Sequence, residues 1–279
     1  MSTTYKQRLS AAFVRVFDNA RPGRGRLVEL CLLLVAGLFL AGAILPGRAG
    51  SFGVNPSADA FVTTGPTGNL NGNNYGGAGA LSVAAPGLSQ GEFQSVLQFN
   101  LSGAKSSFDG QFGVGQWSIQ SVTLQLTATS PNNAIFNASA AGQFGISWMQ
   151  NDGWLEGSGN PMAPGTSGIT FSSLSSFLSP ADEALGTFSF NGGTSGNSTY
   201  TLGLTASFAA DILAGNNVSL RLFAADSVVS GLFDSRSFTT ASARPLLTIN
   251  VVPEPAIVGL GAAELCVLFG RRLLPQKRA

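Results

Sequence analysis

The side chains that could do chemistry in this chain are mainly carboxylates, because the chain contains no histidine. That absence excludes Ser-His-Asp and Cys-His catalysis and histidine-ligated zinc. Asp152 and Glu156 are close enough in sequence to meet across a turn, and a glycosidase needs two carboxylates. A simpler interpretation is that the acidic residues cap turns and face solvent. Tyr75 with Lys105 as the base of a lyase is a weaker alternative, so we predict no catalytic residues.

The three tryptophans are candidates for sugar binding, since aromatic faces suit pyranose rings. Trp117 and Trp148 lie in strand-like segments, which predicts that they belong to the core. Trp154 lies in a glycine-rich loop beside Glu156, where it is either a plug that locks the loop or an exposed platform. The plug is the favoured interpretation. We keep Trp154 and Tyr75 as candidate glycan contacts.

The few basic side chains and the scattered acids supply the remaining candidates. Arg236 and Arg244 are expected to pair with a carboxylate or with backbone carbonyls rather than with a ligand. A calcium site that uses Asp59, Asp152 or Glu156 is an alternative, since hard oxygen ligands from separate loops suit that ion. No dense Asp/Asn ladder supports such a site, so we predict no metal ion and no cofactor.

Strands must position most of these residues, because apolar and polar residues alternate in many segments. The pattern slips between Ile119 and Val122, which predicts a bulge or a strand start. A glycine-rich stretch over 65–79 predicts a long loop, and helical spacing over 206–214 before Gly215 predicts one short helix. The predicted strands are 97–101, 122–126, 200–204 and 218–222, with others near 59–63, 80–84, 144–149, 186–190 and 246–251.

The charge of the segment 51–251, which we call the body, restricts its partners. It contains four bases and ten acids, and 4 − 10 gives a net charge of −6. A weakly acidic body lacks the excess of basic residues that nucleic-acid binding needs, and it is repelled by anionic polysaccharide unless a cation bridges the two. The only cysteines, Cys31 and Cys266, lie in apolar terminal segments, so the body cannot depend on disulfides.

The first 49 residues are arranged like a signal peptide. Six bases precede an apolar run over 30–45, and small residues follow that run. Cleavage after Ala43 or Ala49 fits the small-residue rule, and an uncleaved signal anchor is the alternative. Cys31 is not preceded by small residues, which argues against a lipid anchor.

The last 28 residues combine an extended motif, a short apolar run and a basic end, in the order Val252, Pro253, Glu254, Pro255, then 256–270, then Arg271 and Arg272. The prolines forbid helix and stiffen the motif. The run is short for a permanent membrane span, and Glu264 in its middle is costly in a bilayer. The basic end can hold the segment at the cytoplasmic face. These features favour a temporary hold over a lasting anchor.

This arrangement resembles the PEP-CTERM sorting signal of proteins secreted by Gram-negative bacteria that also make exopolysaccharide. The resemblance implies recognition and removal by an exosortase in the inner membrane. The motif residues that carry over are Pro253, Glu254 and Pro255, with Arg271 and Arg272 as the stop.

Segments of the body also resemble, in order, those of DNRLRE-type domains, which are carbohydrate-binding-module-like. The resemblance implies a jelly-roll β-sandwich in a secreted bacterial protein, and some members of that family bind acidic polysaccharide. The likeness is weakest over 161–192, and the body lacks the basic surface that would explain binding of a uronate polymer. The segments that carry the likeness are 58–62, 73–76, 95–102, 119–126, 152–159, 235–236 and 244–247.

We therefore predict an all-β protein with three parts: a signal peptide or signal anchor (1–49), a single jelly-roll β-sandwich with one short helix (51–251) and a sorting signal (252–279). An N-terminal signal helix and a C-terminal hydrophobic helix flank the sandwich. The predicted function is non-enzymatic: export, transient attachment to the inner membrane, and transfer to the cell envelope or extracellular matrix. Expected partners are an exosortase-type enzyme and exopolysaccharide, without nucleic acid. The alternatives are a glycan-binding module and a polysaccharide lyase or hydrolase.

Overall fold

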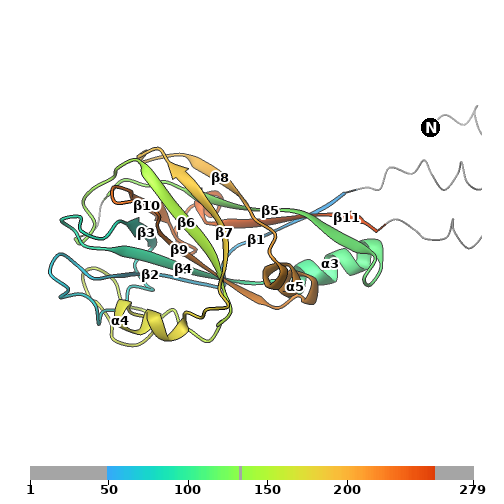
Figure 1. Cartoon of the computed structure of the whole chain (residues 1–279), viewed down its shortest axis with the longest axis horizontal. Coiled ribbons are helices and arrows are strands. Elements are labelled where there is room, and N and C mark those ends of the chain that lie inside the picture. The colour runs from blue at the N-terminus through green and yellow to red at the C-terminus, as the bar shows by residue number, and fades with distance from the viewer. Residues whose placement is uncertain (1–48, 132–133, 255–279) are drawn as a thin grey trace, which may run out of the picture. The chain divides into compact units, whose positions relative to one another are not determined.

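Two antiparallel β-sheets contain most of the secondary structure (Figure 1) in a computed structural model that describes residues 49–131 and 134–254. The smaller sheet has the order β1-β11-β5-β8, and the larger has the order β10-β3-β4-β9-β6-β7, with β2 also paired to β4. The smaller sheet consists of β1 (Gly50–Val54), β11 (Leu246–Pro253), β5 (Trp117–Thr127) and β8 (Asn197–Leu202). The larger consists of β10 (Ser230–Asp234), β3 (Ala80–Ala84), β4 (Phe93–Asn100), β9 (Asn217–Ala224), β6 (Gly142–Met149), β7 (Glu183–Phe190) and β2 (Ala58–Thr63).

The main core lies between the two sheets, where every second side chain of a strand points inward. In β11 the buried residues alternate with partly exposed ones, since successive side chains point to opposite faces of a sheet. Leu247, Ile249 and Val251 are fully buried. Each such side chain contributes about 1.5–3 kcal/mol by leaving water. The prediction of an all-β fold with sandwich-like layers is confirmed, and the core continues across the sheets through Val122, Leu124, Leu97, Phe99, Phe144, Leu220 and Leu222.

The larger sheet is also covered on its outer side, over β2 and β4. Nearly every residue of β2 is buried, which a strand with one solvated face would not show. The cover comes from the segment after β6, which includes α4 (Phe171–Leu174) and the 3₁₀ helix η1 (Ser175–Phe177). A second apolar cluster forms there from Ala60, Val62, Val96, Met149, Trp154, Ile169 and Leu174. Trp154, Ile169 and Leu174 are therefore interior, although the sequence of this segment is typical of a surface loop.

The predicted short helix is present as α5 (Ala206–Ala214). Phe208 and Ile212 are its buried residues, and Gly215 ends it in the left-handed conformation with φ 72°. The expectation of only one helix is wrong, because α3 (Ser102–Phe112) and the one-turn α4 are also helical. The residues of α3 are rich in serine and glycine, which is typical of a loop, and it packs through Ala104 and Phe108.

Other expectations about the strands are met in detail. All nine predicted strands are present, and the slip between Ile119 and Val122 is a bulge in β5. Asn250 pairs with Ser121 while Val251 pairs with Ile119, so one residue of β5 has no partner in the register. The stretch 65–79 is a loop. Sequence patterns missed β1 and β10, which are short and contain glycine.

The chain enters and leaves the described region side by side. Gly50 at the start of β1 pairs with Val251 near the end of β11. Strand β11 continues through Val252 and Pro253, the first residues of the predicted sorting motif, and Glu254 N–H donates to the Gln116 carbonyl at 2.9 Å.

Within residues 49–131 and 134–254, no helix has the length and apolarity needed to cross a bilayer. The predicted signal helix and hydrophobic helix, together with Pro255, Arg271 and Arg272, lie outside the described residues.

Candidate functional site

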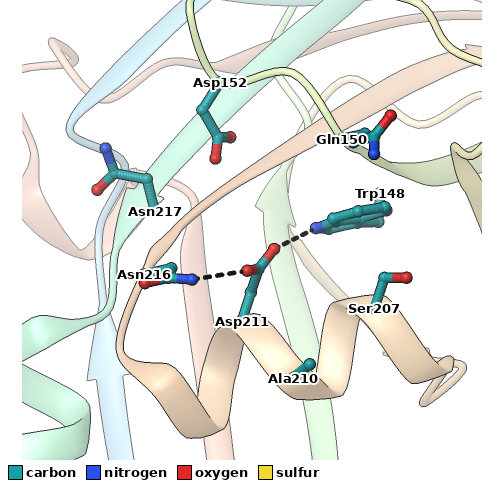
Figure 2. Close-up of a pocket in the computed structure, with 8 residues that line it drawn as sticks. All are labelled: Trp148, Gln150, Asp152, Ser207, Ala210, Asp211, Asn216 and Asn217. Carbon is teal, nitrogen blue, oxygen red and sulfur yellow. Dashed lines mark hydrogen bonds between the residues drawn. The ribbon is translucent and has the colours of Figure 1, made fainter.

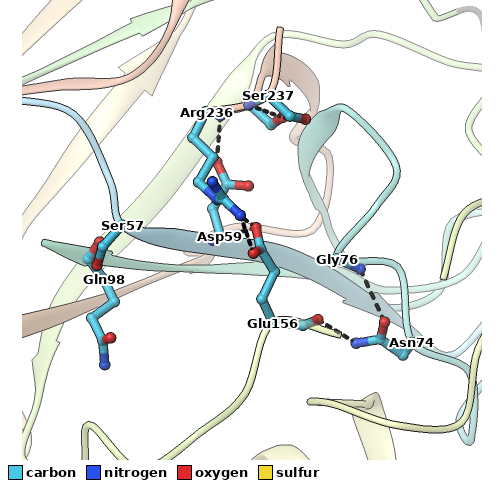
Figure 3. A network of polar contacts seen from close by, with 9 residues as sticks. Ser57, Asp59, Asn74, Gly76, Gln98, Glu156, Arg236 and Ser237 are labelled. Atoms are coloured by element: carbon cyan, nitrogen blue, oxygen red, sulfur yellow. Dashed lines mark hydrogen bonds and ion pairs between the residues drawn. The ribbon is translucent and has the colours of Figure 1, made fainter. Parts of the chain in front are cut away.

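Polar contacts join segments that are distant in sequence into a cluster that we call the loop network: Asp59, Asn74, Glu156 and Arg236 (Figure 3). The Arg236 guanidinium binds Glu156 through two hydrogen bonds, Nε to Oε1 at 2.6 Å and Nη2 to Oε2. The Arg236 backbone N–H donates to Asp59 Oδ2 at 2.7 Å, and the Asp59 N–H donates to Glu156 Oε1 at 3.1 Å. Paired hydrogen bonds of this kind are among the strongest between side chains. The predicted pairing of Arg236 with a carboxylate is confirmed.

Asp59 is the most perturbed acid of the loop network. It is 1% exposed, and burial raises its pKa from 3.8 to about 7. The hydrogen bond from Arg236 N–H opposes this shift, the charge of Glu156 adds to it, and the charge of Arg236 opposes it. Strongly shifted pKa values occur in catalytic sites and in structural ion-pair networks. Here Arg236 and Glu156 supply both the hydrogen bond and the nearby charges, and these two residues are paired with each other. That arrangement favours a structural role for Asp59.

Asn74 fixes the loop network to the segment that covers the larger sheet. Its side chain is fully buried. Nδ2 donates to the carbonyls of Glu156 at 2.7 Å and Ile169 at 2.8 Å, while Oδ1 accepts from the N–H groups of Gly76 at 3.2 Å and Gly159 at 3.1 Å. An asparagine amide has two donor hydrogens and two acceptor lone pairs, so its capacity is filled. This one side chain therefore holds the loop 65–79 against the segment around 156–169.

The two candidate glycan contacts are interior, which corrects that prediction. Trp154 is 3% exposed, and its Nε1 donates to Ser219 Oγ at 2.9 Å. Tyr75 is 1% exposed, and its ring stacks on Phe61 with 4.8 Å between centroids. Neither ring offers a face to a sugar, because protein atoms cover both. The favoured interpretation of Trp154 as a plug that locks its loop agrees with this burial.

The residues considered for catalysis make other contacts. Glu156 is held by Arg236, whereas Asp152 lines a separate groove described below. Tyr75 lies in the interior with its hydroxyl accepting from Asn73 at 3.1 Å. Lys105 forms an ion pair with Asp109 one turn along α3. Neither the glycosidase pair nor the lyase pair is brought together as a unit.

The remaining tryptophans and Arg244 occupy the predicted kinds of position. Trp117 and Trp148 are 4% and 5% exposed and belong to the main core. Arg244 Nε donates to the backbone carbonyl of Phe238 at 2.8 Å. The acidic residue Glu183 accepts the backbone N–H groups at the start of α5, so the prediction that acids cap local structure is met there.

An open groove of about 570 Å³ lies beside α5, and we call it the α5 groove (Figure 2). Its walls come from the end of β6, the segment after it, α5 and the turn into β9. The side chains of Asp152 and Asp211 approach it from opposite sides. Its lining consists of Trp148, Gln150, Asp152, Ser207, Ala210, Asp211, Asn216 and Asn217.

The two carboxylates of the α5 groove differ in how well they are satisfied. Asp211 Oδ2 accepts from Trp148 Nε1 at 3.0 Å, and Oδ1 accepts from Asn216 Nδ2 at 2.9 Å. Asp152 Oδ1 is buried and has no hydrogen-bond partner in the described region. Burial raises the pKa of Asp152, hydrogen bonding to Ser219 opposes that rise, and the charge of Asp211 adds to it. Asp152 therefore lines the groove, while its Oδ1 atom is closed to solvent.

The three acids of the calcium alternative do not come together as a ligand set. Asp59 and Glu156 meet at Arg236, where the guanidinium supplies the positive charge, whereas Asp152 lies in the α5 groove. Over residues 49–131 and 134–254, no cluster of three or more acidic or other ligating side chains is arranged to hold a metal ion.

Sequence reasoning named three of the four loop-network residues, Asp59, Glu156 and Arg236, but gave no role to Asn74, although loop asparagines commonly hydrogen-bond nearby backbone. In the groove it named Trp148 and Asp152. It used the turn after residue 214 only as a helix stop, yet Asn216 in that turn also fixes the Asp211 carboxylate. The signal for the groove was weak, because its residues come from separate segments that only the fold brings together.

No protein-family model matches the chain, and no curated protein is significantly similar to it. The interpretation of its function therefore depends on its residues and their geometry.

Proposed function

We propose that the chain is an exported, non-enzymatic protein of the cell envelope or extracellular matrix, folded as a jelly-roll β-sandwich. In this proposal the N-terminal segment directs export, and the C-terminal segment holds the protein transiently in the inner membrane. An exosortase-type enzyme then cuts near the motif 252–255. The observation that carries the proposal is the order of motif, apolar run and basic end in the last 28 residues.

The geometry of β11 supports a cut that leaves the body folded. Val252 and Pro253 still pair with β5, and Glu254 N–H bonds to the Gln116 carbonyl. Cleavage on the C-terminal side of Pro253 would leave every pair of β11 in place. The released body would then keep the buried Val251 and its share of the main core. We therefore expect the released protein to remain as stable as the uncut one.

Intact-mass measurement of the exported protein tests this proposal. In a Gram-negative host that encodes an exosortase, we expect a chain shortened at both ends, with a C-terminus within or just after the motif. Pro255→Ala should slow the C-terminal cut, whereas Pro180→Ala, at an exposed position outside the motif, should not. An exported protein with an intact C-terminus contradicts the proposal, as does identical trimming in a strain without the exosortase.

Association with exopolysaccharide belongs to the same proposal, and the α5 groove is the observation that favours it. Small-ligand sites are concave and orient their ligand through a few well-placed polar groups. The groove is concave, and polar side chains line it. Asp152, two residues before Trp154, is the part of that loop that lines the groove.

A further inference from the structure

We propose that the α5 groove binds a hydroxyl-rich glycan that carries no acidic groups, either a neutral sugar or an amino sugar. This inference refines the glycan association in the proposed function. It places the contact on α5 and the end of β6, and it names the charge class of the ligand. Both sugar types share the chemistry that matters here, a dense set of hydrogen-bond donors.

The lining of the groove matches such a ligand in shape and polarity. Six of its eight residues have polar side chains that end in a carboxylate, an amide or a hydroxyl: Gln150, Asp152, Ser207, Asp211, Asn216 and Asn217. An apolar ligand would leave these groups without partners, which is costly once water is displaced. Closely spaced sugar hydroxyls can satisfy several of them at once. Trp148 contributes the edge of its indole, since its Nε1 faces Asp211 (Figure 2).

Asp152 supplies a charged acceptor to the lining of the groove. Its Oδ1 is closed to solvent and has no hydrogen-bond partner in the described region, so a ligand meets another part of the Asp152 side chain. A carboxylate in the lining favours a ligand that brings hydroxyl or ammonium donors, because hydrogen bonds to a charged group are strong. Asp211 already accepts two hydrogen bonds, which fix its position opposite Asp152.

The charge of the groove excludes acidic sugars. Two carboxylates line it and no basic side chain does. The body as a whole carries a net charge of −6 from four bases and ten acids. A uronate would bring a third negative charge close to Asp152 and Asp211 without a counter-charge in the lining. The ligand class therefore differs from the acidic polysaccharide that the family resemblance implies.

The groove is held in shape by the core beneath it. Phe208 and Ile212 anchor α5 in the interior, and Glu183 accepts the N–H groups of Ser207 and Phe208 at 3.1 and 3.2 Å. Trp148 is in the main core. A site whose side chains are fixed before binding loses less entropy when a ligand arrives.

Retention on immobilised glycans tests the inference with the full-length chain, kept in a detergent that has no sugar head group. The probes are neutral β-glucan and galactan, chitosan fragments as amino sugars, and alginate and pectate as uronates. We expect saturable retention on a neutral or an amino-sugar probe and none on the uronates. Persistence of that retention in high salt separates hydrogen bonding from simple attraction of a polycation to an acidic protein.

Two pairs of variants assign the binding to the groove. Ala210→Phe fills the groove from an exposed position of α5, and its matched control is Ala214→Phe, exposed on the same helix but outside the lining. Asp152→Ala removes one of the two carboxylates of the lining. We expect Ala210→Phe and Asp152→Ala to weaken binding by about tenfold or more, and Ala214→Phe to leave it unchanged.

Three results would overturn the inference: no retention on any probe, retention on uronates that Ala210→Phe abolishes, or retention that neither groove variant changes. These outcomes are separate from the masses that test the proposed function. A correctly processed protein that binds no glycan refutes only the groove, and a glycan-binding protein with an intact tail refutes only the sorting.

Discussion

The loop network and the α5 groove use the same kinds of residue to opposite effect. Each has carboxylates and an asparagine, and residues 148–156 contribute to both. In the loop network the Asn74 amide is completely bonded and Arg236 is matched by Glu156. In the groove the Oδ1 atom of Asp152 is buried and has no hydrogen-bond partner in the described region. Residue types alone therefore do not identify a site, and what distinguishes the two regions is whether the protein satisfies its own polar groups.

Among the variants that test this difference between the two regions, Asn74→Ala should lower the free energy of unfolding most. Removing the side chain leaves the carbonyls of Glu156 and Ile169 and the N–H groups of Gly76 and Gly159 without that partner. Because buried polar groups without partners are costly, we expect a loss of about 4 kcal/mol in the free energy of unfolding, measured by urea denaturation. Asn216→Ala in the groove should cost under about 1 kcal/mol. Equal losses would mean that the two regions do not differ as described.

The second-largest effect should be a pH dependence of stability that the raised pKa of Asp59 causes. Its pKa is raised from 3.8 to about 7 in the folded state, so between these values the folded chain holds a proton that the unfolded chain has lost. Stability is therefore highest at the acidic end of this window, falls as pH rises through it and levels off above about 7. Relative to Asp59→Asn, which keeps an acceptor for Arg236 N–H, the wild type should lose about 4 kcal/mol across the window. Parallel pH profiles for the two proteins would contradict the burial argument.

Loss of the ion pair between Arg236 and Glu156 should have the third-largest effect on the free energy of unfolding. Arg236→Met leaves Glu156 without its guanidinium while keeping much of the apolar volume. Because the Arg236 side chain is 36% exposed and that of Glu156 is 17% exposed, we expect about 2 kcal/mol rather than the larger cost of a fully buried pair. The comparison is Lys105→Met, which breaks the ion pair within α3 and should cost under about 1 kcal/mol. A smaller loss for Arg236→Met than for Lys105→Met would refute the structural role of the loop network.

The smallest effect on stability should come from Asp152→Asn in the groove. The change removes a carboxyl group whose pKa is raised by burial and by the charge of Asp211, and it breaks no ion pair. We expect the free energy of unfolding to change by less than about 0.5 kcal/mol at pH 5 and to shift in favour of the variant as pH rises. A strong destabilisation in urea titrations would show that Asp152 belongs to the architecture and not to a binding groove.

Local patterns predicted the parts of the fold that local physics decides. Alternation located the strands, helical spacing before Gly215 located α5, and the slip near Gln120 located the bulge in β5. Helix α3 was missed because its serine- and glycine-rich residues lack a strong helical period, and contacts through Phe108 with the rest of the fold stabilise it. Tertiary structure overrode the local preference there.

The candidate site was less predictable because it depends on contacts between distant residues. The burial of Trp154 follows from the apolar cluster over β2 and β4, and nothing in its own loop encodes that cover. Asp152 and Asp211 are brought to one groove by the packing of α5 beside the end of β6. Their unequal hydrogen bonding is a property of the fold and has no counterpart in residue types or spacing.

The three tryptophans allow the most direct test of the claim that the α5 groove, and not the Trp154 loop, contacts ligand. With ¹⁵N-tryptophan in the full-length chain, each indole N–H gives one NMR signal: Trp148 reports the groove, Trp154 its contact with Ser219 and Trp117 the contact with Asp109. When the neutral or amino-sugar probe that is retained best is added, we predict that the Trp148 signal shifts most and the Trp117 signal stays in place. A shift of Trp154 with Trp148 unmoved would contradict the account.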